Sequence, residues 1–516
     1  MTNTAVSTVP NAKRLLWAGF TAILAAGVGF SVRGGVLGQW AEQFGFTMTE
    51  LGTITGGGLT GFGIVIILSS LIADRIGYGK LMVLAFLLHF VSAVLTLATP
   101  AFFASGGKDA AYWCLFSAMF IFAVGNGVCE AVVNPLTATL FPKDQTKYLN
   151  ILHAGWPAGL VLGGVSSAFM AGSKGEAGNV INAPVDWKIQ MSLFLIPVIA
   201  YGILLMGQKF PRSHASSAGI TLKQMIGTIL APLMIILLVI HALVGYVELG
   251  TDSWISKITG SIMASPTKGL ILFSYTSMLM FVLRFFAGPI VHRISPIGLL
   301  CISALLGFTG LQLLGSATSV AFCVLAATIY ACGKTFLWPT MLAVVSERFP
   351  KGGAVAIGLV GGVGMLSAGL IGGPAIGFKQ DYNASHNLQE KAPAAYDRYK
   401  AANENTFAGF KTVGLDGAKV GILEDNGGEL ARAGKLLESQ GKKDENHAKL
   451  QTWWDTAKAD AAADKPVVQE AGLFGGRMAL KLTSFVPAVM ALLYLGLLLY
   501  FKSIGGYRPL TIDEER

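Results

Sequence analysis

Long apolar stretches recur along this chain of 516 residues, in which only 13% of the residues are charged. Each stretch has about the 20 residues that a helix needs to cross a bilayer. Lipid offers the backbone no hydrogen-bonding partner, so spans of this kind must be helices. We therefore predict an all-α membrane protein with twelve transmembrane helices, at about 15–39, 50–73, 81–99, 112–140, 148–172, 187–207, 227–251, 269–291, 296–316, 319–346, 352–378 and 480–502.

The basic residues between these spans are distributed unevenly. Alternate loops and both tails hold fourteen of them: Lys13, Arg14, Arg75, Lys80, Lys143, Lys147, Lys209, Arg212, Lys223, Arg293, Arg348, Lys351, Lys502 and Arg508. The opposite short loops hold only Lys108, Lys174, Lys188, Lys257 and Lys268. Cytoplasmic loops carry the excess of Lys and Arg, so we expect both termini in the cytoplasm and the spans in the cell (inner) membrane. This bias also accounts for the net charge of +9 without a nucleic-acid partner.

The chain divides into two related parts. Glu130 precedes Pro135 by five residues, as Lys334 precedes Pro339, and the tripeptide Phe-Pro-Lys follows each proline. The longest loop on the cytoplasmic side lies between spans six and seven. We therefore expect two pseudo-symmetric halves of six helices each, residues 1–207 and 227–516, joined by a linker at 208–226.

A polar segment, residues 380–475, interrupts the second half between spans eleven and twelve. The orientation places it outside the cytoplasm. Residues 428–440 and 446–462 have the periodicity of amphipathic helices, with Trp453 and Trp454 as apolar anchors. We expect a small helical extracytoplasmic insertion.

Charged side chains within the spans are the first candidates for function, because charge in a membrane is costly and is usually retained for transport. They are Arg33, Glu130, Glu248, Arg284 and Lys334, with Asp252 at the end of span seven as a further candidate that can equally lie at the outer interface. We expect Glu130 and Glu248 to couple protons, since a carboxylate that changes its cationic partner between two states changes its affinity for a proton. We expect Arg33, Arg284 and Lys334 to bind substrate. Static ion pairs between helices are the alternative.

Other polar and aromatic side chains in the spans are candidate substrate ligands. Trp156, Trp338 and Tyr246 can stack on a sugar ring, although aromatic residues also pack helices. Asn134, Asn150 and His153 can bind hydroxyl groups or bridge neighbouring helices.

The loop between spans two and three resembles a motif of the major facilitator superfamily, G-x-x-x-D-R-x-G-R/K. Asp74, Arg75 and Gly77 occupy its positions, and His292 and Arg293 form a degenerate copy in the second half. The resemblance implies a transporter with alternating access, in which these loop residues tie helix ends together at a cytoplasmic gate.

Within the superfamily, Glu130, Asn134 and Pro135, followed by Asn150 and His153, resemble the fucose, galactose and glucose proton symporters. That resemblance implies a role for Glu130 in proton coupling and a sugar contact at the position of His153. Arg33 stands near the place of an aspartate in that family, as in branches that carry organic anions or phosphate esters.

We therefore expect a secondary transporter, functional as a monomer, that moves a small polar metabolite, most simply a sugar, by proton symport. An organic anion transporter that uses Arg33, Arg284 and Lys334 is the first alternative, and a transporter-like receptor that binds without flux is the second. The sequence has no HExxH, GxSxG or nucleotide-binding loop, so we expect no enzyme activity, no metal and no cofactor.

Overall fold

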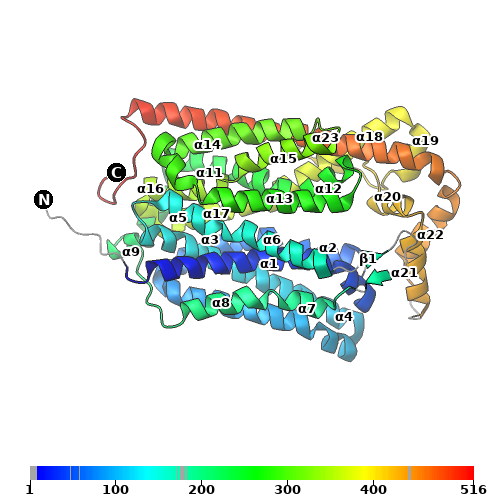
Figure 1. Cartoon of the computed structure of the whole chain (residues 1–516), viewed down its shortest axis with the longest axis horizontal. Helices are drawn as coiled ribbons and strands as arrows, with labels where there is room; N and C mark the ends of the chain where they lie inside the picture. The colour runs from blue at the N-terminus through cyan, green and yellow to red at the C-terminus, as the bar shows by residue number, and fades with distance from the viewer. Residues whose placement is uncertain are drawn as a thin grey trace.

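The computed structural model describes residues 9–46, 48–56, 58–170, 173–174, 180–182, 184–439 and 443–515. Long helices run side by side along one direction, and α1 begins at the end of the molecule where α23 finishes (Figure 1). We call this the terminal end. Helices α19 to α22 lie at the opposite end, which we call the insertion end.

The N-terminal helices form one group in the lower part of Figure 1. They are α1 (Ala12–Phe44), α2 (Met48–Gly56), α3 (Gly58–Ile76), α4 (Tyr78–Leu140), α5 (Gln145–His153), α6 (Gly155–Met170), α7 (Trp187–Ser192) and α8 (Leu195–Leu205). Strands β1 (Ser173–Lys174) and β2 (Val180–Asn182) pair antiparallel between α6 and α7. The next short elements are α9 (His214–Ser217), α10 (Leu222–Gly227) and the 3-10 turn η1 (Thr228–Leu230).

The C-terminal helices form the second group. They are α11 (Pro232–Gly245), α12 (Thr251–Ile262), α13 (Pro266–Arg284), α14 (Ala287–Leu314), α15 (Val320–Lys334), α16 (Leu337–Arg348), α17 (Gly353–Ser367), α18 (Gly373–Lys391) and α23 (Ala461–Ser503). Two π-helical turns, η2 (Tyr246–Gly250) and η4 (Ala368–Gly372), and the 3-10 turn η3 (Pro350–Gly352) join some of them.

Ten helical segments in the described part of the chain are long and apolar enough to cross a membrane. The difference from the predicted twelve has two sources. Helix α4 contains predicted spans three and four in 63 residues, with non-helical backbone at Gly107. Predicted span five is divided between α5 and α6, which meet at Ala154, and its last two residues lie outside the described ranges. Predicted span eight also differs, because α13 ends at Arg284 and α14 continues through a break at Ser295.

The insertion is built between two extended helices. Helix α18 continues to Lys391 and α23 begins at Ala461, so both reach well beyond the apolar stretches that predicted them. Between them lie α19 (Pro393–Tyr399), α20 (Gly417–Glu424), α21 (Gly428–Ser439), α22 (Glu445–Ala457) and the hairpin of β3 (Asn405–Phe407) and β4 (Phe410–Thr412). The predicted amphipathic helices are present as α21 and α22, although α22 ends five residues early and Gln440 lies outside the described residues.

A compact core holds the insertion together. Tyr399, Leu423 and Trp454 are buried in one apolar cluster. Beside it, the guanidinium of Arg398 donates to both carboxylate oxygens of Asp464, at 2.7 and 2.6 Å. A bidentate pair of this kind fixes direction as well as distance, so it ties α19 to the start of α23.

Glycine allows the closest helix contact near the centre of the C-terminal group. A Cβ on Gly245 of α11 would lie 2.0 Å from the carbonyl oxygen of Gly364 in α17. Only glycine permits this approach, and small residues are the usual means of bringing membrane helices together. The contact fixes the start of η2, which carries Glu248.

The two groups meet through polar contacts at the terminal end. Glu347 of α16 accepts from Thr146 of α5 at 3.1 Å and from Tyr507 of the C-terminal tail at 2.6 Å. Asn150 of α5 donates to Thr340 of α16 at 3.1 Å. These bonds close the terminal end between α5 and α16.

Candidate functional site

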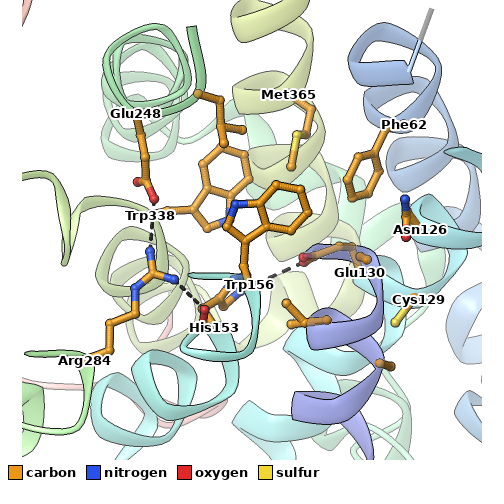
Figure 2. A pocket seen from close by; sticks show the side chains of 14 residues that line it. Phe62, Asn126, Cys129, Glu130, His153, Trp156, Glu248, Arg284, Trp338 and Met365 are labelled. Atoms are coloured by element: carbon orange, nitrogen blue, oxygen red, sulfur yellow. Dashed lines mark hydrogen bonds and ion pairs between the residues drawn. The ribbon is translucent and has the colours of Figure 1, made fainter. Parts of the chain in front are cut away.

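A cavity of about 30 Å³ lies between the two groups of helices, with room for roughly two water molecules. Figure 2 shows its wall from close by. The lining residues come from α1, α3, α4, α5, α6, η2, α13, α16 and α17: Ala22, Ile23, Ala26, Phe62, Asn126, Cys129, Glu130, His153, Trp156, Glu248, Leu249, Arg284, Trp338 and Met365. Two carboxylates and one guanidinium thus face a space formed by both groups.

Glu130 accepts a hydrogen bond from an amide, which in turn is bonded to an imidazole. Asn134, one turn later in α4, donates from Nδ2 to Glu130 Oε2 at 2.6 Å. His153 of α5 has its Nε2 2.8 Å from the amide oxygen of Asn134 and 4.0 Å from Glu130 Oε2. An amide oxygen can only accept, so His153 donates from Nε2. Among the described residues, no Lys or Arg forms an ion pair with Glu130.

Glu248 is paired with a cation. Arg284, the last residue of α13, donates from Nη2 to Glu248 Oε1 at 3.0 Å, and both side chains are buried. The same guanidinium donates from Nη1 to the backbone oxygen of His153 at 2.5 Å and from Nε to that of Thr335 at 3.0 Å. Figure 2 shows Arg284 pointing between Glu248 and His153. Arg284 therefore joins α5 of the N-terminal group to η2 and the end of α15.

Two Trp-Pro steps position the tryptophans of the wall. Trp156-Pro157 follows the break between α5 and α6, and Trp338-Pro339 follows the break between α15 and α16. Proline has no N–H, so it cannot bond to the carbonyl four residues earlier and the helix bends there. Both tryptophans line the cavity, and Figure 2 labels them among its wall residues.

Hydrogen bonds connect the two carboxylates across the cavity wall. They run from Glu130 through Asn134 to His153, and from the His153 backbone oxygen through Arg284 to Glu248. The path crosses from the N-terminal to the C-terminal group at the bond between Arg284 and His153. A relative movement of the groups would change the surroundings of both carboxylates at that point.

Some predicted ligands lie outside the cavity wall. Arg33 is buried with its guanidinium 4.3 Å from the centre of the Phe122 ring. Asn150 bridges α5 and α16, as described above. Tyr246 accepts from Lys379 at 3.0 Å. Asn134 stands behind Glu130 and supports it.

Lys334 also lies away from the central cavity. It forms an ion pair with Asp252 of α12 and lines a smaller cavity of about 10 Å³ between α12, α13 and α15. Phe273 and Tyr330 place their rings within 6 Å of its ammonium group, at 5.9 and 5.4 Å. Lys334 is thus neutralised within the C-terminal group.

The predicted gate residues lie at the terminal end. Asp74 of α3 points toward the start of α17, where a Cβ on Gly353 would lie 3.6 Å from its Oδ2. His292 of α14 lies 3.5 Å from Asp144, which precedes α5. The pair of His292 and Asp144 joins the two groups of helices, and Asp74 lies close to the C-terminal group.

The remaining members of the gate motif have other environments. Arg75 and Arg293 are exposed. Gly77 has a φ of 93°, in the region that favours glycine, at the turn between α3 and α4.

The sequence analysis missed eight residues of the cavity wall: Ala22, Ile23, Ala26, Phe62, Asn126, Cys129, Leu249 and Met365. Asn126 lines the cavity one helical turn before Glu130 and accepts from His89 at 3.0 Å. Residues four apart share a helix face, so its spacing from Glu130 was a usable signal. Phe62 and Met365 complete the apolar wall, and nothing in their sequence context separates them from other apolar residues of the spans.

A family model of the major facilitator superfamily matches residues 19–373. The chain belongs to this superfamily. The resemblance carried by the loop motif is thereby confirmed, and transporters, rather than enzymes, make up the family. The chain is a multi-pass membrane protein.

Solved structures share this fold at low sequence identity. FucP, the fucose:proton symporter of E. coli, in an outward conformation, is 16% identical with a TM-score of 0.58 over 71% of this chain and 92% of its own. A bacterial homologue of the human lysosomal transporter Spinster is 12% identical, with a TM-score of 0.60 over 94% and 96%. The human organic anion transporter TETRAN is 12% identical, with a TM-score of 0.58 over 94% and 100%. A search of curated proteins gives no match.

Proposed function

We propose that this chain is a twelve-span secondary transporter that moves a small neutral polar solute, most simply a sugar, together with a proton. The two groups of helices act as two six-helix halves that rock about the central cavity, as alternating access requires. The terminal end faces the cytoplasm of a cell (inner) membrane, in keeping with the excess of Lys and Arg in its loops. The state described here is closed on that side.

The observation that carries the proposal is the charge of the cavity wall. Two carboxylates, Glu130 and Glu248, face the space, and Arg284 is the cation among the lining residues. Arg284 already pairs with Glu248. Protonation is then the simplest way to neutralise Glu130, because a buried carboxylate without a cation is costly.

The same wall has the features of a site for a hydroxylated ring. Trp156 and Trp338 offer flat apolar faces, while His153 and Asn126 offer polar groups. Sugar sites combine such faces with a few polar groups that fix orientation. A sugar is larger than the present cavity of about 30 Å³, so binding must widen the cavity wall.

The likeness to FucP, a fucose:proton symporter, supports this choice. The likeness to TETRAN keeps an organic anion as the alternative. Arg33 and Lys334, which an anion site would need, do not line the cavity. An anionic substrate would therefore have to pair with Arg284, and this would require Arg284 to break its ion pair with Glu248.

Uptake into proteoliposomes under an imposed inward proton gradient tests the proposal. A panel of labelled neutral sugars and carboxylates is offered to the purified protein. We expect one or more sugars to accumulate and a protonophore to abolish accumulation. Transport of carboxylates alone would favour the anion alternative, and binding without any flux would favour a receptor.

A further inference from the structure

The guanidinium of Arg284 makes three hydrogen bonds, two of them to backbone carbonyls at the two Trp-Pro breaks. Its Nη1 donates to His153 O and its Nε to Thr335 O. Pro157 and Pro339 stand four residues after these two carbonyls, so each carbonyl lacks its regular helical donor. The next regular bonds are from Ala158 to Ala154 and from Thr340 to Phe336, both at 3.2 Å.

The two breaks are not copies of each other within the internal repeat. The repeat relates Pro135 to Pro339, whereas Pro157 belongs to the following span. Two helices of different origin nevertheless present freed carbonyls to one side chain. Both breaks flank the cavity, and they lie in opposite groups of helices.

We infer that Arg284 is a positioning residue that clasps the two Trp-Pro breaks together while the terminal end is closed, and that it releases His153 O when that end opens. The planar guanidinium has donors in fixed directions, so it satisfies both carbonyls and Glu248 at once. Its bond to His153 crosses between the groups, and its bonds to Thr335 and Glu248 remain within the C-terminal group. The crossing bond is therefore the one that a rocking movement breaks.

This inference rests on the proposed alternating access and adds a role for Arg284 other than substrate binding. It also accounts for the presence of both Trp156 and Trp338 on the cavity wall. Each stands immediately before the proline that frees a carbonyl, so the clasp holds both indoles on the cavity wall. Release of the clasp would free the two breaks to move apart and let the cavity widen toward the terminal end.

The rate at which an engineered disulfide forms across the terminal end measures how often that end is closed, and the measurement needs no substrate. A Cβ on Gly288 of α14 would lie 3.3 Å from the Cβ of Lys147 in α5. This is close to the separation of about 3.5–4.5 Å in a disulfide. We would introduce Lys147→Cys and Gly288→Cys together and measure the rate of oxidative cross-linking in membranes.

Three variants are then compared in this background. Arg284→Lys keeps a positive charge for Glu248 but loses the planar guanidinium that bonds two carbonyls at once. Pro157→Ala returns a backbone N–H that can bond to His153 O, and it leaves every polar side chain in place. Pro487→Ala, in the interior of α23 and outside the cavity wall, is the matched control. We expect Arg284→Lys to slow cross-linking about tenfold, which corresponds to about 1.4 kcal/mol. Pro157→Ala should slow it at least ~3-fold, or about 0.7 kcal/mol, and Pro487→Ala should leave it unchanged.

Rates within about twofold of the parent for both Arg284→Lys and Pro157→Ala would overturn the clasp. So would a slowing in only one of the two, or an equal slowing in Pro487→Ala. The cross-linking needs no solute and no proton gradient. A failure of the sugar and proton assignment would therefore appear in the uptake assay and leave this result interpretable.

Discussion

Glu130 and Glu248 face one cavity but are buried in different ways. Glu130 accepts from the neutral amide of Asn134, which is oriented in turn by His153. Glu248 accepts from the guanidinium of Arg284. The comparison indicates two different roles. A carboxylate that accepts only from neutral donors can gain and lose a proton, whereas a carboxylate paired with Arg is stabilised in its charged form.

The backbone conformation also differs at the two glutamates. Glu130 lies in a regular part of α4, while Glu248 lies in the π-helical turn η2. Such turns are rare and often occur at functional sites. The carboxylate that pairs with Arg284 thus lies on irregular backbone, whereas Glu130 does not.

The largest effect on stability is expected at Arg284. Arg284→Met leaves Glu248 buried without its cation and should destabilise the protein by about 3–5 kcal/mol. The double variant Arg284→Met/Glu248→Met should recover much of this loss, because the uncompensated charge is gone. Unfolding in detergent, followed by fluorescence, measures both. A loss below ~1 kcal/mol in the single variant, with no recovery in the double, would remove the distinction between the two carboxylates.

A smaller effect is expected at Asn134. Asn134→Leu takes the donor from Glu130 and the acceptor from His153, and should cost about 1–3 kcal/mol. The same change in a Glu130→Leu background should cost less, because one of the two stranded groups is absent. The same unfolding measurement applies. Equal costs in both backgrounds would mean that the amide does not support Glu130.

The smallest effect is expected at the ion pair of Lys334 and Asp252. The double variant Lys334→Met/Asp252→Leu replaces a buried pair by apolar side chains, and its stability should change by less than ~1 kcal/mol or increase. Solute affinity should stay within about twofold, since neither residue lines the central cavity. Equilibrium binding of the solute identified by uptake measures this, and a tenfold loss would return Lys334 to the substrate site.

The sequence predicts the membrane class and the superfamily well, for physical reasons. Apolar runs of fixed length follow from the thickness of the bilayer, and the loop around Asp74 is a local motif. Span limits are less predictable where helices continue across an expected loop. Gly107 interrupts α4 with a single non-helical residue, which hydropathy alone cannot distinguish from a loop.

The partners of the charged residues could not be predicted, because they depend on the rotation of each helix. The internal repeat relates Lys334 to Glu130, yet Lys334 turns to Asp252 and only Glu130 reaches the cavity. Asn126 could have been predicted from its spacing of four residues from Glu130. The acceptors of Arg284 are backbone groups, so no side-chain motif reveals them, although the prolines four residues later mark both carbonyls.

The central claim, that Glu130 carries the coupled proton, is tested most directly by comparing accumulation and exchange in one preparation. Glu130→Gln keeps the size of the side chain and an oxygen for Asn134, but it cannot gain or lose a proton. For a sugar that the parent protein accumulates, we expect Glu130→Gln to retain exchange across the membrane and to lose accumulation under the proton gradient. Accumulation equal to that of the parent would contradict the account.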